Sequence, residues 1–283
     1  MADTELNVIT RGRIPGGAKR EVTSALRDCY RRFSPRVPDK VEVHIVDKET
    51  TMRDFLREEK FRLGITTSGD EEFVCSHDAW RGYPRITICL ERLARFNRLA
   101  RLGAIRHEAA HSVLHGFLEY YIFRIPEDCR RTAMIKGIDS AVLGQALYYL
   151  SVAVKDFEAT RLLVEYDYIN CQFAFALEWI QPSEEDESAW KLAKANRQAK
   201  FVYQTTLLKP TLFAHPLLSL PKSKRISLKY QVQLGGRVEE LVGHLGEGEG
   251  SKLLQVSNMI VESLTEDTHK NVDLALHQAM SLA

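Results

Sequence analysis

The chain has 283 residues, of which 45% are hydrophobic and 27% charged, a composition typical of a globular protein with a sizeable core. Its 39 Lys and Arg nearly balance 38 Asp and Glu, so net charge gives no reason to expect nucleic acid or an anionic membrane as a partner. The five cysteines are scattered and form no CxxC pair, which argues against a disulfide framework and against a cysteine-ligated zinc site. The longest mainly apolar stretch without charge, residues 140–154, is too short to span a bilayer, and the start of the chain lacks the apolar core of a secretory signal. We therefore expect a cytoplasmic protein without a membrane span.

The first 90 residues mix helical and strand patterns. Apolar residues at helical spacing predict a helix over 17–33, and the alternation in VEVHIV predicts a strand over 41–46. A second helix follows, for which Thr50 or Thr51 is the expected cap. Residues 65–90 are typical of two or three short strands broken by turn residues. This order predicts a small sheet with flanking helices.

From residue 90 onward the pattern is helical. The polar sequence QPSEEDES, residues 181–188, is expected to be a loop that separates a domain over 1–180 from a helical extension over 181–283. Within the extension, prolines are expected to interrupt the helices, and a glycine-rich stretch is expected to be a flexible connector before two last amphipathic helices. These features are Pro210, Pro216 and Pro221, residues 235–250, and the helices 251–264 and 265–282.

The sequence RHEAAHSVLHG carries the most specific chemical signal. His107 and His111 are one helical turn apart, which lets two imidazoles converge on one ion. Glu108 lies about 100° round the helix from His107, where a carboxylate can act on a water molecule without binding the metal. The neighbouring residues are apolar enough to bury the helix, and a buried group of this kind needs compensation such as a metal provides. A third protein ligand must come from elsewhere, because a catalytic zinc holds three.

Two acids in the later sequence KDFEATRLLVE are candidates for that ligand. Asp156 and Glu158 stand among apolar residues, where acids need a partner.

HEAAHSVLHG followed by DFEAT resembles the minigluzincin metallopeptidases, especially the ImmA/IrrE-type peptidase family, over residues 40–165. The resemblance implies an α+β, zincin-like fold in which a small mixed or antiparallel sheet packs on the HExxH helix. It implies that His107 and His111 bind one Zn²⁺ per chain and that Glu108 is the general base. Aligned on the motif, Asp156 takes the place of the ligand acid and Thr160 that of the residue that orients a histidine. Both depart from the family pattern, which has Glu and then Asn or Asp, and Glu158 therefore stays an alternative ligand.

The implied activity is metal-assisted hydrolysis of peptide bonds by a zinc metalloprotease. An extended peptide or protein substrate is expected to add as a strand along the sheet edge within 73–89. The residue that stabilises the oxyanion is left open among four candidates. These are Tyr120, Tyr121, Tyr166 and His215.

Three further interpretations are weighed against this one. His115 is either a third histidine ligand or, in better agreement with helix geometry, a packing or supporting residue. The chain is alternatively a catalytically weak or inactive zinc-binding regulatory protein of the same fold. Arginines at every third position before the motif could contact nucleic acid, but a solvated helix face is the better interpretation, because no recognised DNA-binding motif accompanies them. These arginines are Arg92, Arg95, Arg98 and Arg101. Sequence does not indicate the oligomeric state.

Overall fold

The computed structural model describes residues 4–65, 73–221 and 225–283, and its contacts divide the chain into two compact units. The first unit comprises Met1–Tyr121 with Leu162–Phe175, and the second comprises Ile122–Arg161 with Ala176–Ala283. The two units therefore interleave along the sequence, whereas the expected domains meet at residue 180. The expected assignment of a peptidase domain and a helical extension stays a prediction. No helix in the described ranges is long and apolar enough to cross a membrane.

The first unit is α+β, which confirms the expected fold class. Its elements in chain order are β1 (Glu5–Arg11), α1 (Gly16–Phe33), β2 (Lys40–Val46), α2 (Glu49–Leu63), β3 (Cys75–Asp78), β4 (Arg85–Cys89), α3 (Leu90–Leu93), α4 (Arg98–Leu114) and the 3₁₀ turn η1 (Leu118–Tyr121). The end of α6 and the start of α7 also belong to this unit.

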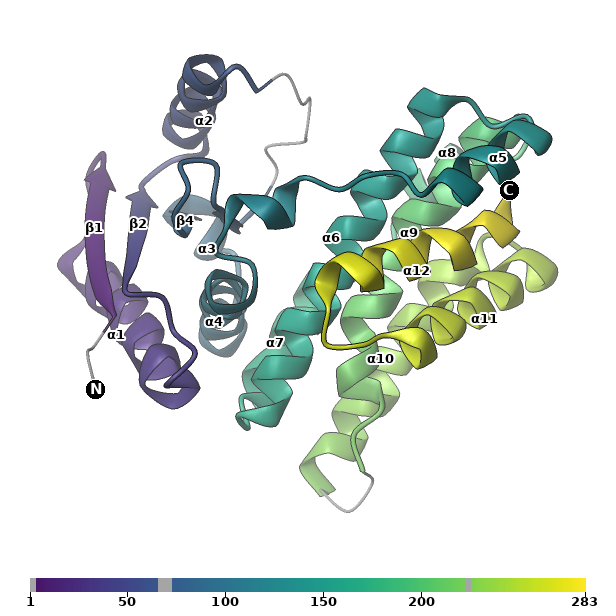
Figure 1. The fold of residues 1–283 in the computed structure, drawn as a ribbon. Helices are drawn as coiled ribbons and strands as arrows, with labels where there is room; N and C mark the ends of the chain where they lie inside the picture. The colour runs from purple at the N-terminus through teal and green to yellow at the C-terminus, as the bar shows by residue number, and fades with distance from the viewer. Residues whose placement is uncertain (1–3, 66–72, 222–224) are drawn as a thin grey trace. The chain divides into compact units, whose positions relative to one another are not determined.

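The sheet of the first unit has four strands in the order β1-β2-β4-β3 (Figure 1). β1, β2 and β4 run parallel, and β3 pairs antiparallel with β4, so the sheet is mixed. β3 is thus an edge strand and lies within the expected range 73–89. β1 was not expected, because its residues are only partly buried and its sequence ELNVITR lacks a clean apolar alternation.

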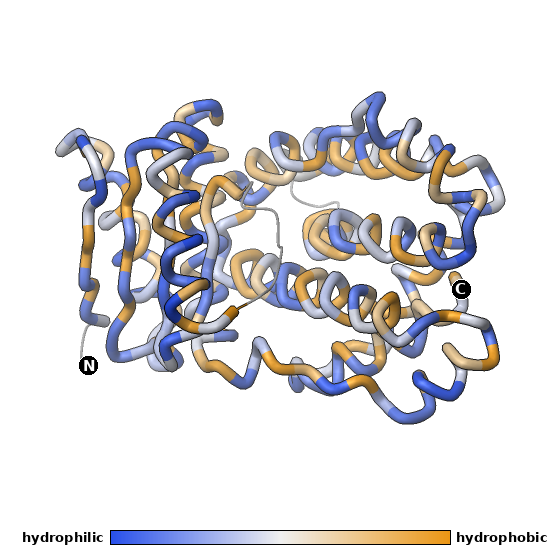
Figure 2. Tube along the Cα trace, turned by 90° about the horizontal axis from the view of Figure 1, so that it is seen from above, coloured by the Kyte–Doolittle hydropathy of each residue, from blue (hydrophilic) through white to orange (hydrophobic). Residues whose placement is uncertain are grey.

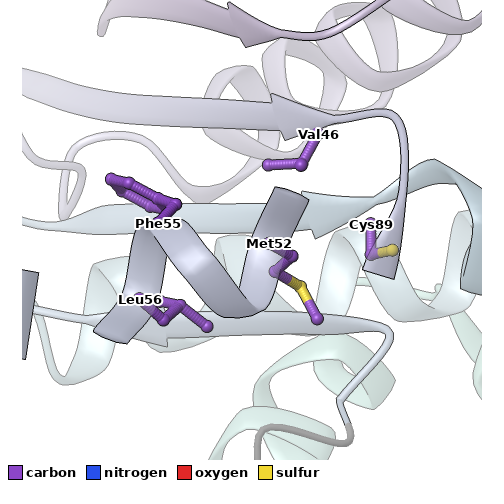
Figure 3. Close-up of a cluster of buried hydrophobic side chains, with 5 residues drawn as sticks. All are labelled: Val46, Met52, Phe55, Leu56 and Cys89. Carbon is purple, nitrogen blue, oxygen red and sulfur yellow. The ribbon is translucent and has the colours of Figure 1, made fainter. Parts of the chain in front are cut away.

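Helices cover both faces of this sheet. α2 packs on one face through a cluster of buried apolar side chains (Figure 3), whose members are Val46, Met52, Phe55, Leu56 and Cys89. α4 lies against β3 and β4, and α1 lies against α4. The Tyr30 hydroxyl on α1 is 2.7 Å from the Ser112 hydroxyl on α4, a buried hydrogen bond that fixes the two helices together. The HExxH helix is therefore held by contacts with both the sheet and α1.

A buried charge network supports the edge strand. The Arg85 guanidinium on β4 donates to Asp78 Oδ2 on β3 at 3.0 Å and to Glu59 Oε2 on α2 at 2.7 Å. Burial raises the pKa of the Asp78 carboxyl, and the charge of Arg85 opposes that rise. Since each charge has a partner, the network is tolerated in the interior and joins β3, β4 and α2.

Every regular element described in the second unit is a helix. Its elements are α5 (Glu127–Ile135), α6 (Ser140–Glu165), α7 (Ile169–Trp179), α8 (Glu184–Ala193), α9 (Arg197–Leu218), α10 (Arg225–Gly243), α11 (Glu247–Ser263), α12 (Thr268–Ala279) and the 3₁₀ turn η2 (Met280–Leu282). The first parts of α6 and the last parts of α7 lie here. Apolar and hydrophilic residues alternate along these helices, as amphipathic packing requires (Figure 2). α9 is central, since α8, α10 and α11 all pack against it.

Three local expectations for this unit were wrong. α9 continues through Pro210 and Pro216, because its buried face gains enough packing to offset a cost of about 3 kcal/mol for a proline in a helix. The stretch 235–250 is mostly helical rather than a connector, since only three residues separate α10 from α11. The acidic part of QPSEEDES begins α8, where Ser183 and Asp186 form a capping box. The last two expected helices are confirmed as α11 and α12.

In the first unit, the expected cap of the second helix was also wrong. α2 begins after Lys48, so Thr50 and Thr51 lie inside the helix, and the Thr51 hydroxyl donates to Asp47 Oδ1 at 3.1 Å.

Candidate metal and catalytic centre

The position of α4 is fixed at its start and in its middle. The Asn97 side chain caps the helix by accepting from the backbone N–H groups of Leu99 and Ala100. Gly103 allows a close approach, because a Cβ at this position would lie 2.2 Å from the backbone oxygen of Cys171 on α7. A hydrogen bond of 3.0 Å from Gln172 Nε2 to the Gly103 carbonyl reinforces the same contact. These contacts fix the part of α4 that lies one turn before His107, and so they also position the motif residues.

His107 and His111 lie side by side on α4. Both are buried, and their Nε2 atoms are 3.1 Å apart. Two nitrogens that share one tetrahedral zinc are about 3.4 Å apart, given the usual zinc–nitrogen distance. Phe175 lies near the His107 ring, with 5.7 Å between ring centroids, and gives the pair an apolar border. The donor set and its spacing fit a zinc ion.

His115 lies one turn beyond His111 and is fully buried at the C-terminal cap of α4. Its Nδ1 atom is 3.1 Å from Nδ1 of His111, on the far side of the His111 ring from His107. A histidine whose Nε2 binds a metal uses its Nδ1–H to hold an outer partner. The geometry therefore favours the supporting role of His115 over the ligand role.

Glu108 is buried beside the histidines and close to residues of β3 and η1. Burial is the main cause that raises the pKa of the Cys75 thiol and of the Tyr121 hydroxyl, and the negative charge of Glu108 raises both further. The Tyr121 hydroxyl also lies 2.8 Å from His77 Nδ1. Tyr121 is therefore a protonated hydrogen-bond donor near Glu108 at neutral pH.

His77 is a site residue that the sequence pattern did not single out. Its ring lies 6.1 Å from the His111 ring in a parallel arrangement. Strand alternation explains its position, since β3 pairs Cys75 with Ile88 and His77 with Ile86, and so turns both residues to one face. That alternation could have pointed to His77 only with the pairing of β3 already known.

Asp156 and Glu158 belong to the part of α6 in the second unit, and they leave that helix on opposite sides because two residues correspond to about 200°. Both Glu158 carboxylate oxygens accept hydrogen bonds from α12, one from Thr268 Oγ1 at 2.8 Å and one from Asn271 Nδ2 at 2.6 Å. Asp156 has Lys209 Nζ at 3.7 Å. Both carboxylate oxygens of Glu158 are thus used in hydrogen bonds within its own unit.

The other candidate residues have contacts of their own. Tyr166 packs edge-on against Phe33, and the His215 ring lies near Phe157 in the second unit. Tyr120 lies near His115, with 5.5 Å between ring centroids. The Thr160 hydroxyl donates to the Asp156 backbone oxygen at 2.8 Å, within α6.

Three of the four arginines that precede the motif make polar contacts within the first unit. Arg92 is buried and bonds to the Phe73 carbonyl and to Glu49, while Arg95 pairs with the same glutamate. Arg101 lies 3.7 Å from Glu21.

No family model, curated protein or solved structure matches the chain. The site is therefore interpreted from its own residues.

Proposed function

We propose that this protein is a zinc-dependent metallopeptidase with a zincin-like arrangement of α4 against the mixed sheet. The observation that carries the proposal is the pair of buried histidine nitrogens 3.1 Å apart, with Glu108 buried beside them on the same helix. Two buried imidazoles facing each other through Nε2 and an adjacent carboxylate are costly without an ion. The motif resemblance to the minigluzincins supports the same function.

Asp156 is the third ligand in this proposal. Glu158 is the weaker candidate, because Thr268 and Asn271 already use both of its oxygens. A carboxylate that must leave such bonds to reach a metal would leave buried donors unsatisfied. Asp156 is also the residue that the motif alignment places at the ligand position.

Each residue of the centre has a defined part in peptide hydrolysis. A zinc ion would act as a Lewis acid and lower the pKa of a water molecule toward neutrality. Glu108 accepts the proton of that water and later passes it to the leaving amine. Tyr121, held by His77, donates a hydrogen bond to the developing oxyanion, and His115 holds the His111 ring in position.

The substrate in this proposal is an extended peptide segment that pairs with β3. β3 is the last strand in the order of the described sheet, and α4 lies beside it. Backbone hydrogen bonds to an edge strand bind a peptide largely independently of its sequence, so side-chain pockets must set the specificity.

The decisive experiment compares Glu108→Gln with Glu119→Gln, an exposed glutamate of η1. With a fluorogenic peptide library, Glu108→Gln should lower the cleavage rate by about 10²- to 10⁴-fold while zinc content is retained. Glu119→Gln should cleave like the wild type. Equal cleavage by the Glu108→Gln protein would refute the proposed mechanism.

A second candidate function is zinc-dependent regulation without catalysis. Thr160 favours it, because this residue stands where the family has Asn or Asp and donates its hydroxyl proton within its own helix. In that case Glu108→Gln would leave the biological activity unchanged, and wild-type protein would not cleave any member of the library.

A further inference from the structure

A second group of side chains that could hold a metal ion lies in the second unit, on helices other than the HExxH helix. Asp128 and Cys129 lie in the first turn of α5, and His277 lies in the last turn of α12. One donor atom from each of these three residues lies within 4.8 Å of the other two. The group therefore combines a thiol, an imidazole and a carboxylate from two separate helices.

The side chains of this group are already oriented toward one another. His277 Nε2 is 3.0 Å from Asp128 Oδ2, a spacing that two ligands of one ion can share. The other carboxylate oxygen, Asp128 Oδ1, accepts from the Cys129 backbone N–H at 2.9 Å, which holds the carboxylate in place. Cys129 is fully buried, whereas about half of the Asp128 side chain is exposed. An ion from solution can therefore enter from the Asp128 side.

Asp273 adds negative charge to the same place. It stands one turn before His277 on the same face of α12. Burial raises the pKa of its carboxyl, and the charges of His277 and Asp128 act on that pKa in opposite directions. Two carboxylates near one imidazole leave a local negative field that suits a divalent cation.

We propose that Asp128, Cys129 and His277 form a second metal site, for a borderline-soft divalent ion such as Zn²⁺. A thiolate with an imidazole selects such an ion over Mg²⁺ or Ca²⁺, which prefer sets of oxygen ligands. Asp273 or water completes the tetrahedral coordination. The ion ties α5 to α12, next to the place where the Lys136 ammonium group bonds to the carbonyls of Met280 and Ala283. Its role is to hold the C-terminal helix, and it is independent of peptide hydrolysis.

Cobalt absorption tests this site separately from the proposed catalytic site, whose proposed ligands include no cysteine. Metal-free His107→Ala/His111→Ala protein is titrated with Co²⁺. One equivalent should produce a thiolate-to-cobalt charge-transfer band, and this band should be lost in the same background with Cys129→Ser added. Glu127→Gln, which changes the exposed neighbour of Asp128, should keep it. Absence of the band, or its persistence in Cys129→Ser, would overturn the proposal.

A thermal readout covers the case in which the cysteine variant does not fold. His277 is half-exposed, so His277→Ala should melt like its parent without metal. Zinc at a hundredfold excess over the Kd should raise the Tm of the His107→Ala/His111→Ala protein by about 5 °C or more. Added His277→Ala should abolish that rise. An equal rise with and without His277 would contradict the site, whatever the outcome for peptide cleavage.

Discussion

At the scale of single residues, Arg85 shows how the first unit tolerates buried charge. Its side chain is 1% exposed and lies between Asp78 and Glu59. Removing Arg85 leaves Asp78 buried without its cation and Glu59 with only its more exposed arginine partners, which costs more than the pairing itself contributes. The network also fixes β3, the strand that carries His77 and the proposed substrate edge.

Replacement of Arg85 by Met should therefore lower the free energy of unfolding by about 3 kcal/mol or more, because Asp78 and Glu59 lose their shared partner. Arg81→Ala is the matched control. It removes another arginine from Glu59, but one whose side chain is 38% exposed, so the cost should be about 1 kcal/mol or less. Urea denaturation measures both, and similar losses in the two variants would show that the network is not a stabilising unit.

The choice between Asp156 and Glu158 gives a second prediction at this scale. The test uses a His277→Ala background, which leaves only the α4 site. Losing a residue that merely supports a metal ligand weakens metal binding by roughly 10- to 100-fold. If Asp156 is itself a ligand, Asp156→Asn should weaken zinc binding by more than this. Glu158→Gln should keep zinc and lower stability by about 1 kcal/mol, since one hydrogen bond to α12 is weakened. Competition with a zinc chelator measures the affinities. Loss of zinc in Glu158→Gln alone would reverse the assignment.

At the scale of elements, the close approach of α4 and α7 keeps the motif helix in place. Only glycine fits at residue 103, where the backbone of α7 occupies the space of a side chain. Gly144, inside α6, has no atom within 4 Å of where its Cβ would be. Packing thus requires glycine at residue 103, whereas it leaves room for a side chain at residue 144.

We expect Gly103→Ala to lower stability by about 1–3 kcal/mol through overpacking against Cys171. Gly144→Ala should instead raise stability by about 0.5–1 kcal/mol, since alanine restricts the unfolded chain and favours the helix. Thermal and urea unfolding of the two variants gives the signs. A stabilised Gly103→Ala protein would contradict the packing described for α4.

Much of the fold is local and could be predicted from sequence. The helices α1, α11 and α12 and the strand β2 have clear apolar periods, and the spacing of His107 and His111 fixes their common face once α4 is a helix. α9 could not be predicted through its two prolines, because tertiary packing offsets their local cost. β1 could not be predicted either, since a partly buried edge strand need not alternate.

The candidate site was predictable only in part for the same reason. The pairing of β3 positions His77, and a 3₁₀ turn positions Tyr121, whose pKa the charge of Glu108 affects. Neither position can be inferred from residue spacing in the sequence. Sequence left Asp156 and Glu158 open, because the bonds that hold Glu158 come from α12, more than a hundred residues later.

At the scale of the whole molecule, stability should depend on pH through His44. Burial lowers the pKa of this histidine below 6.5, although Glu42, 2.6 Å away, opposes the shift. The unfolded chain then binds more protons than the folded protein, so stability is highest above pH 6.5 and falls as the pH drops below it. The slope from one such group is at most about 1.4 kcal/mol per pH unit. In His44→Gln the slope between pH 6.5 and 5 should be smaller; an unchanged slope would exclude His44 as its source.

The central claim for this molecule is that α4 carries a catalytic zinc ion. Anomalous diffraction from crystals of the zinc-loaded protein, recorded on both sides of the zinc absorption edge, tests it most directly. The expected result is a strong peak within coordination distance of both His107 Nε2 and His111 Nε2, with Asp156 as the nearest carboxylate, whether or not a second peak lies at Cys129 and His277. Density without an anomalous peak at these two nitrogens, in crystals grown with zinc, would contradict the claim.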